Sequence, residues 1–133
     1  MKQLYIVEDN EADLVLIMEI LKELDENIKV HFSRDGAEAI DFLIKVNRNQ
    51  VAFMPDLILL DINIPKIDGF EVLNFIKSSE ALKKIPVIIL STSSAEKDKK
   101  FAYVLKSDGF LTKSPDLNEF IGTMESIKAK WLS

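Results

Sequence analysis

An aspartate ends an apolar segment near the middle of the chain. Residues 57–60 read Leu-Ile-Leu-Leu, and Asp61 follows directly. A carboxylate beside a buried strand costs free energy unless opposite charge or hydrogen bonds compensate it. Two more carboxylates, Glu8 and Asp9, follow the apolar run at residues 4–7. If the fold brings the three together they repel one another, and at least one of them should resist ionisation.

A hydroxyl and an ammonium group end two later apolar runs. Ser91 follows residues 87–90, and Lys113 follows residues 108–112. The three carboxylates carry a formal charge of −3, Lys113 adds +1, and one Mg²⁺ ion would bring the sum to zero. Mg²⁺ prefers carboxylate oxygens and accepts backbone carbonyls. Asp9, Asp61 and the main-chain carbonyl of Asn63 would therefore suit it.

This set of groups predicts phosphoryl transfer. The Asp61 carboxylate would attack phosphorus in line, while the metal and the Lys113 ammonium neutralise charge on the transferring oxygens. Such chemistry needs a fold that delivers an acidic pair, an aspartate, a hydroxyl and a lysine to one place.

Alternating apolar runs and helical patterns indicate a fold of that kind. Five apolar runs fit strands, and three are apolar throughout, as strands covered on both faces are. Helical patterns separate the runs, and the last keeps its spacing for four turns from Leu117 to Trp131. We therefore predict an α/β protein with a parallel sheet and helices on both faces, and ligands bind at the carboxyl ends of such strands. The five runs are residues 4–7, 28–32, 57–60, 87–90 and 108–112.

Capping residues predict where three of the helices begin. Ser114 is expected to cap the last helix, with Pro115 at its first position. Ser93 and Glu96 have the spacing of a capping box at the helix that follows the fourth run. Asp68 is expected to form the turn and cap before the third helix.

The composition excludes several classes of protein. At 133 residues the chain is expected to be one domain, residues 1–133, and its 47% apolar content argues against disorder. A net charge of −5 without a basic stripe argues against nucleic-acid binding. No apolar run approaches the roughly 20 residues of a membrane span, and the amino terminus does not resemble a signal peptide. The absence of cysteine excludes disulfides and thiolate metal sites and fits a cytoplasmic protein.

In order and spacing, these motifs resemble the receiver domain of two-component response regulators over nearly the whole chain. "IVEDN" resembles the acidic pair of that family, "LLDINIPKIDG" its phosphoacceptor loop, "PVIILST" its switch hydroxyl and "DGFLTK" its lysine. Asp61 and Ser91 are 30 residues apart, and Ser91 and Lys113 are 22 apart, as in the family. The resemblance implies a flavodoxin-like (βα)5 fold with strand order 2-1-3-4-5.

The resemblance implies roles for the residues around the phosphate. Asp61 would accept it from a phosphohistidine on a partner protein, Ser91 would hydrogen-bond it, and Lys113 would pair with it. Phe110 occupies the position of the switch aromatic residue. Many relatives have tyrosine there, whereas Phe110 has no hydroxyl to form a hydrogen bond when it turns inward.

Mg²⁺ is the cofactor that the resemblance implies. Asp9 and Asp61 would bind it directly, Glu8 would help through a water molecule, and Asn63 would offer its backbone carbonyl. The chain would then catalyse only its own Mg²⁺-dependent phosphorylation and dephosphorylation.

The implied partners are proteins. The phosphodonor would be a sensor histidine kinase or a histidine phosphotransfer protein. The output would pass through the fourth helix, fifth strand and fifth helix, because Ser91 and Phe110 lie there and can respond to phosphate as a two-state element. That surface would bind a downstream protein or a second copy of the chain.

Two departures from the family pattern affect these expectations. The segment between Asp9 and Asp61 is longer than usual, with the excess placed in "NRNQVAFMP", which is similar to single-domain regulators that partner bacterial phytochromes. The family usually has Lys-Pro at the end of the fifth strand, often with a cis bond, whereas this chain has Lys113, Ser114 and then Pro115. We predict a cis Lys113–Ser114 bond that aims the lysine at the phosphate.

Two other classes of function stay open at this point. A Mg²⁺-dependent phosphatase or phosphotransferase could use an aspartyl-phosphate intermediate, although it would usually carry a second carboxylate where Asn63 stands. A binding module could hold the same acidic pocket without any chemistry. Taken alone, Asp9 could be a helix cap and Glu8 a solvated residue at a strand end.

Overall fold

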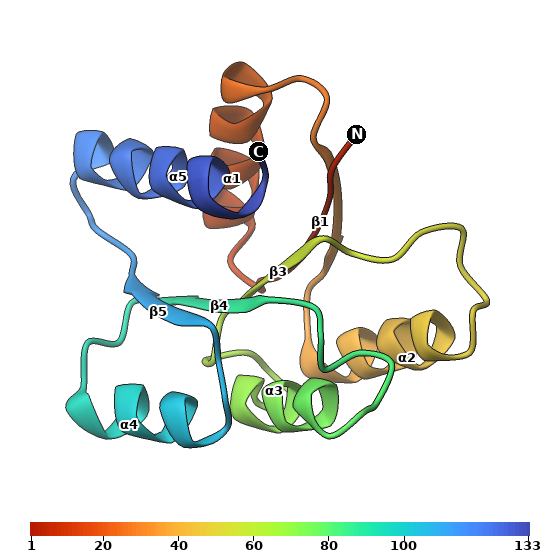
Figure 1. Cartoon of the computed structure of the whole chain (residues 1–133). Helices are drawn as coiled ribbons and strands as arrows, with labels where there is room; N and C mark the ends of the chain where they lie inside the picture. Colours follow the sequence, from red (N-terminus) through yellow and green to blue (C-terminus); the bar gives the residue numbers. More distant parts are fainter.

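Strand and helix alternate five times along the chain, and the computed structural model describes all 133 residues. The strands form one parallel sheet in the order β2-β1-β3-β4-β5, so the predicted fold class and strand order are confirmed (Figure 1). None of the helices combines the length and apolar character that crossing a membrane requires. The elements are β1 (Gln3–Val7), α1 (Glu11–Leu24), β2 (Lys29–Ser33), α2 (Gly36–Asn47), β3 (Leu57–Leu60), α3 (Gly69–Lys77), β4 (Val87–Ser91), α4 (Glu96–Val104), β5 (Gly109–Thr112) and α5 (Leu117–Trp131).

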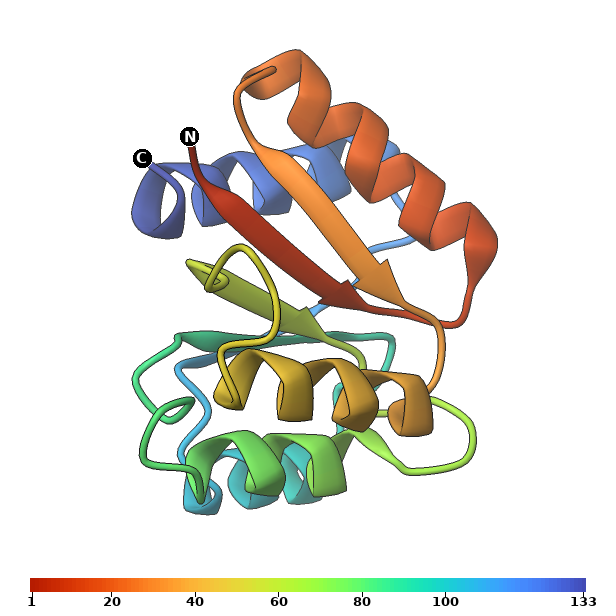
Figure 2. The same ribbon diagram turned by 90° about the vertical axis from the view of Figure 1, so that its right-hand side faces the viewer.

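Helices cover both faces of the sheet, as the uninterrupted apolar runs predict. Helices α1 and α5 lie on one face, and α2, α3 and α4 lie on the other (Figures 1 and 2). Successive side chains of a strand point to opposite faces. In β3, Leu57 and Leu59 therefore pack with α1 and α5, while Ile58 and Leu60 pack with the other three helices. All four of these side chains are buried, which gives the sheet a core on each side.

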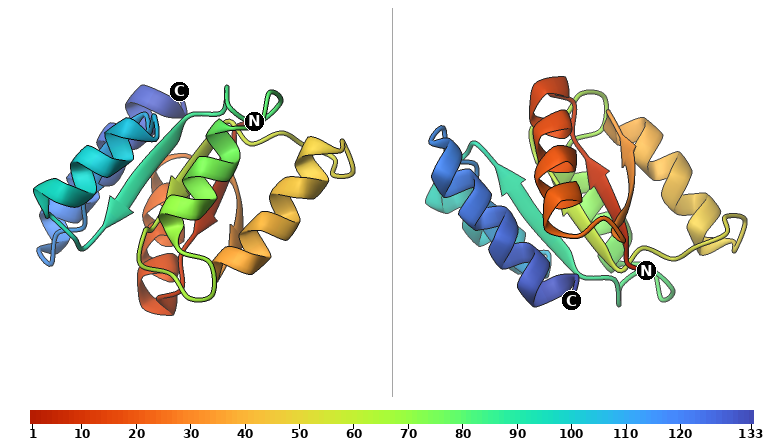
Figure 3. Two further views of the ribbon diagram at one scale, coloured as in Figure 1. Left: turned by 90° about the horizontal axis from the view of Figure 1, so that it is seen from below. Right: turned by 90° about the horizontal axis from the view of Figure 1, so that it is seen from above.

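The register of the strands brings their carboxyl ends to one edge of the sheet. Val7 of β1 lies beside Leu60 of β3, and Ser91 of β4 lies beside Thr112 of β5. The residues that follow these strands therefore emerge together. Helices α4 and α5 lie at the β5 end of the sheet, and α2 lies at the β2 end (Figure 3).

Helix α3 begins as predicted. Asp68 is its N-cap, and the Asp68 side chain accepts a hydrogen bond from the backbone N–H of Glu71 at 3.0 Å. This bond satisfies one of the amide groups that a helix leaves free at its first turn.

The predicted cap of α5 is wrong. Asp116 caps this helix and accepts from the backbone N–H of Glu119, so Ser114 and Pro115 lie outside it. The Ser114 hydroxyl instead accepts from the backbone N–H of Asp116 and donates to the Glu119 carboxylate. Short polar side chains at both 114 and 116 compete for the same helix start, and the sequence pattern does not rank them.

The predicted capping box before α4 is also wrong. The N-cap is Ala95, which has no side-chain hydrogen bond to offer. Ser93 turns its hydroxyl to the Asp98 carboxylate at 2.6 Å and accepts from the backbone N–H of Ala95. Ser93 therefore bonds to groups two and five residues on, rather than closing a reciprocal pair with Glu96.

Gly69 allows α3 to begin directly against the end of β3. A Cβ atom at position 69 would lie 2.4 Å from the Ile62 Cα and 2.5 Å from the Asp61 carbonyl oxygen. The Gly69 N–H also donates to the Ile62 carbonyl at 3.1 Å. Backbone atoms block the added carbon, so the close approach requires glycine. Gly122 in α5 is different, because a Cβ atom there meets nothing within 4 Å.

These two glycines give a matched test of the close approach. We expect Gly69→Ala to lower the free energy of unfolding by about 1–3 kcal/mol, because the backbone must shift to admit the methyl group. Gly122→Ala should raise it by about 0.5–1 kcal/mol, because alanine is the better helix former. Urea denaturation of both variants measures the two changes. Equal destabilisation by both substitutions would contradict the steric explanation.

Candidate functional site

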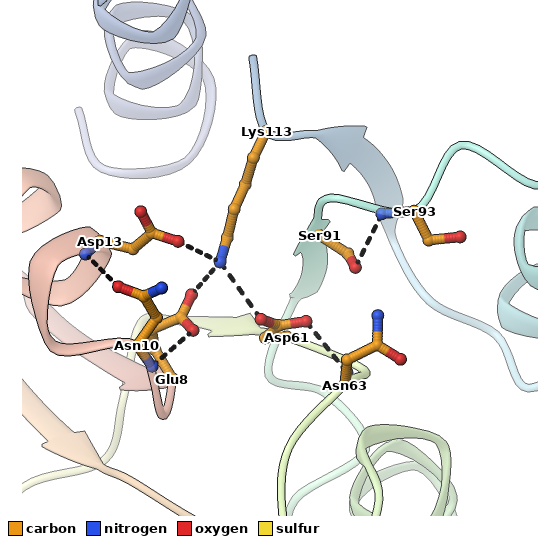
Figure 4. Close-up of polar contacts among 8 residues, drawn as sticks. All are labelled: Glu8, Asn10, Asp13, Asp61, Asn63, Ser91, Ser93 and Lys113. Carbon is orange, nitrogen blue, oxygen red and sulfur yellow. Dashed lines mark hydrogen bonds and ion pairs between the residues drawn. The ribbon is translucent and has the colours of Figure 1, made fainter. Parts of the chain in front are cut away.

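One ammonium group lies among three carboxylates at the carboxyl edge of the sheet (Figure 4). The Lys113 Nζ atom is 2.9 Å from Asp13 Oδ2 and 3.2 Å from Asp61 Oδ2, and it also donates to the Glu8 carboxylate. Lys113, Glu8 and Asp61 are only 8%, 2% and 7% exposed, so most of these charges lie out of water. Charged groups at this depth require partners, and each of these has one.

Asp61 is held at the end of the central strand β3. Its backbone N–H donates to the Val7 carbonyl at 3.0 Å, which extends the pairing of β3 with β1 by one residue. Its Oδ1 atom accepts from the backbone N–H of Asn63 at 3.0 Å, while Oδ2 faces Lys113. Both carboxylate oxygens are therefore oriented, and the group points into the pocket (Figure 4).

Glu8, Asp9 and Asp61 form a group that can hold a cation. One carboxylate oxygen from each lies within 4.8 Å of the others, and Asp9 is the exposed member. Oxygen atoms alone are the donor set of hard divalent cations such as Mg²⁺. Asn63 follows Asp61 by two positions and is exposed, and its backbone carbonyl is one further oxygen near the group. The residues present therefore fit a divalent metal ion.

The pocket changes the acidity of the groups in it. Burial and, to a smaller extent, the charge of Asp61 raise the pKa of Glu8 to about 7, against the opposing effect of the Lys113 hydrogen bond. Burial alone would lower the pKa of Lys113, but its bonds to Glu8 and Asp13 and the charge of Asp61 outweigh this and raise it. Lys113 therefore stays charged, and Glu8 is the carboxyl group that resists ionisation.

Ser91 and Phe110 lie on the neighbouring strands β4 and β5. Ser91 is fully buried, and its hydroxyl accepts from the backbone N–H of Ser93 at 3.2 Å. Its carbonyl accepts from the backbone N–H of Lys113 at 2.7 Å. Phe110 is partly buried and packs against the core on the side of α2, α3 and α4.

The predicted cis Lys113–Ser114 bond is wrong, because the chain contains no cis peptide bond. The Lys113 ammonium still reaches Asp61 at 3.2 Å. Because α5 begins only at Leu117, the residues between Lys113 and the helix form a longer connection than predicted. That connection turns the chain without a cis bond, and the long Lys113 side chain covers the remaining distance to Asp61.

Asp13 is the site residue that the sequence analysis missed. It lies in the first turn of α1, and its backbone N–H donates to the Asn10 side chain, which caps the helix. An acidic residue in the first turn of a helix is ordinarily explained by its favourable interaction with the helix dipole. Its spacing of four residues from Asp9 was the only available signal, and that spacing does not show that the side chain turns toward Lys113.

Comparison with known proteins gives one consistent family. The sequence model described as the response regulator receiver domain matches residues 4–125. Response regulator Rcp1 of Synechocystis sp. is 40% identical over 131 residues, which cover 98% of this chain and 89% of Rcp1. The probable methanogenesis regulatory protein FilR2 of Methanothrix harundinacea is 38% identical over 127 residues, which cover 96% of this chain and 81% of FilR2.

Solved structures agree with the sequence comparison. The crystal structure of the phosphorylated cyanobacterial phytochrome response regulator RcpA has a TM-score of 0.92 and 44% identity, covering 99% of this chain and 94% of RcpA. The Mn²⁺-bound form of Rcp1 has a TM-score of 0.91 and 39% identity, covering 100% of this chain and 96% of that structure.

The raised pKa of Glu8 predicts how stability depends on pH. The folded protein holds the Glu8 proton up to about pH 7, whereas the unfolded chain releases it near 4.5. Without metal, this residue's contribution should be fully present below pH 4.5 and lost as the pH rises through 7, a decrease of about 3 kcal/mol at most. Denaturation of the wild type and Glu8→Gln between pH 4.5 and 8 measures the difference.

The comparison with Glu8→Gln is needed because His31 also titrates within this range of pH. Burial lowers the pKa of His31 from 6.5, so its contribution to stability rises with pH as the unfolded chain loses its proton. This contribution is common to both proteins and cancels in their difference. A difference that does not vary with pH would show that the Glu8 pKa is unshifted.

Proposed function

Because the chain belongs to the response regulator receiver domain family of two-component signalling, we propose that residues 1–133 act as one receiver that is phosphorylated on Asp61. The observation that carries this proposal is the setting of Asp61. It is a buried carboxylate at the end of a central strand, 3.2 Å from an ammonium group and next to two further acids. The structure of phosphorylated RcpA, a relative of 44% identity, supports the same chemistry.

Phosphoryl transfer to Asp61 follows from the groups around it. An Asp61 oxygen attacks the phosphorus of a phosphohistidine, the new O–P bond forms as the P–N bond breaks, and the ring nitrogen takes a proton from water so that neutral imidazole leaves. Lys113 stays protonated and neutralises charge on the transferring oxygens. The Ser91 hydroxyl accepts from the backbone N–H of Ser93 and has its own hydrogen to donate to a phosphoryl oxygen.

Mg²⁺ is the cation that we propose for the acidic group. Glu8, Asp9 and Asp61 would hold it with the backbone carbonyl of Asn63, and Glu8 would act through a water molecule. When bound, the ion supplies positive charge to the attacking carboxylate and to the phosphoryl oxygens. Rcp1, a relative of 39% identity, has been solved in a Mn²⁺-bound form, which supports the binding of a divalent ion.

The phosphodonor that we propose is a sensor histidine kinase or a histidine phosphotransfer protein. The similarity to Rcp1 and to the phytochrome response regulator RcpA favours a kinase of the phytochrome type. The long segment "NRNQVAFMP", which runs from the last residue of α2 toward β3, supports the same subfamily.

Phosphorylation of Asp61 can be tested directly with acetyl phosphate. With Mg²⁺ present, mass spectrometry should show one phosphoryl group per chain, and none without the metal, because the attacking carboxylate then faces uncompensated anions. Asp61→Asn should take up none. Asp68→Asn is the matched control, because it changes another acid of the same loop and asparagine caps a helix equally well.

Each alternative function has its own outcome in this experiment. A full adduct on Asp61→Asn would refute Asp61 as the acceptor. Continuous release of phosphate with many turnovers would indicate an enzyme, and an unmodified wild type would indicate a binding module without chemistry.

An exposed apolar group on α4 supports an output surface made of α4, β5 and α5. Tyr103 and Val104 are 80% and 68% exposed, and Phe101 is 47% exposed. The Phe101 ring also contacts Phe70 at the start of α3, with centroids 4.7 Å apart. Helix α4 thus touches the helix that follows the Asp61 loop, while it presents apolar side chains to solvent. We propose that this surface binds a downstream protein or a second copy of the chain.

Self-association can be measured by light scattering with and without a phosphate mimic. If a second copy is the partner, the mimic should shift the wild type from monomer to dimer. Tyr103→Glu should weaken the dimer at least tenfold, because it places a charge in a buried apolar contact. Val15→Glu, at an exposed position of α1, should leave it unchanged. An identical monomer mass with and without the mimic would exclude self-association as the output.

A further inference from the structure

The three hydrogens of the Lys113 ammonium group are shared among three carboxylates with different surroundings. A lysine ammonium has three donors and no acceptor. Glu8, Asp13 and Asp61 each take one of them. Glu8 and Asp61 belong to the acidic group that fits a cation, together with Asp9, whereas Asp13 does not. Asp13 is thus the one partner of Lys113 that a bound cation leaves free.

Asp13 lies on the outer side of the lysine and is held there. Its side chain is 32% exposed, against 2% for Glu8 and 9% for Asp61. The capping bond from its backbone N–H to Asn10 fixes the first turn of α1, so the carboxylate starts from a fixed position. Asp13 and Lys113 both line a cavity of about 380 Å³ between α1 and the connection from β5 to α5, which gives the ammonium group room to move outward.

We infer that Asp13 is a positioning residue that holds the Lys113 ammonium beside the pocket when a divalent cation binds Glu8 and Asp61. The inference rests on the proposed metal site. Two cations that share the same carboxylate oxygens repel each other at short range, and the pocket's low exposure weakens the screening of that repulsion. The Asp13 carboxylate removes the conflict, because Lys113 can shift toward it while remaining paired and close to Asp61.

Without the Asp13 charge, the lysine and the cation compete for the same oxygens. Lys113 then has only Glu8 and Asp61 as ionic partners, and a cation can enter only by displacing it. Coupling between neighbouring charged groups commonly reaches a tenfold change in an equilibrium constant. We therefore expect Asp13→Asn to weaken Mg²⁺ binding about tenfold.

A double-mutant cycle measured by calorimetric titration with Mg²⁺ tests this. The four proteins are the wild type, Asp13→Asn, Lys113→Gln and the double variant. In the Lys113→Gln background, Asp13→Asn should change the affinity by less than about twofold, because no ammonium group is left to hold. Asp13→Glu should restore binding to within about threefold of the wild type, since it keeps the charge in the same turn.

Glu11→Gln is the matched control for the loss of a negative charge near the site. Glu11 is another acid in the first turn of α1, but its side chain is 74% exposed and faces Arg34. Its removal should change Mg²⁺ affinity by less than about twofold, because exposed charges are screened.

The outcomes separate this inference from the proposed function. Equal weakening by Asp13→Asn with and without Lys113 would show that Asp13 acts on the cation directly, and would overturn the inference. Unchanged affinity in Asp13→Asn would also overturn it, while leaving the metal site and Asp61 phosphorylation intact. A wild type that binds no Mg²⁺ would overturn both the inference and the proposed metal site.

Discussion

The pairing of one buried ammonium group with several carboxylates is the interaction on which this site depends. Lys113 lies within hydrogen-bonding distance of Glu8 and Asp13, which lie near each other where β1 leads into α1, and of Asp61, which follows β3. Each of these charges would be costly at its depth without the others. A parallel sheet meets the requirement because all of its strands end at the same edge, and the two apolar cores beneath hold those ends in register.

That pairing leaves the pocket incompletely neutralised. Lys113 offsets one of the negative charges, while burial and the charge of Asp61 raise the pKa of Glu8 to about 7, so that this carboxyl group resists ionisation. A cation, a proton on Glu8 and a phosphoryl group on Asp61 therefore all change the same electrostatic balance. Under the proposed function, this coupling is what would pass a chemical event at the strand ends to the adjoining loops.

The groups suited to respond are already linked to the pocket through the backbone. Lys113 donates its N–H to the carbonyl of Ser91, and the Ser91 hydroxyl accepts from the N–H of Ser93 in the loop before α4. A change at Asp61 that engaged Lys113 and Ser91 would thus bear on β4, β5 and the loop before α4 together. Helix α4, which follows this loop, exposes the apolar side chains of Phe101, Tyr103 and Val104.

The sequence by itself determined the fold class, the strands and the residues at their ends, because apolar runs and their spacing are local properties. A parallel sheet then brings the residues that follow its strands close together at one edge. The tertiary structure decided what depends on competition between neighbours. Asp116 rather than Ser114 caps α5, no cis bond is needed, and Ser93 bonds to Asp98. It also decided that Asp13 faces Lys113, since this contact depends on the packing of α1 against α5, which sequence spacing does not encode.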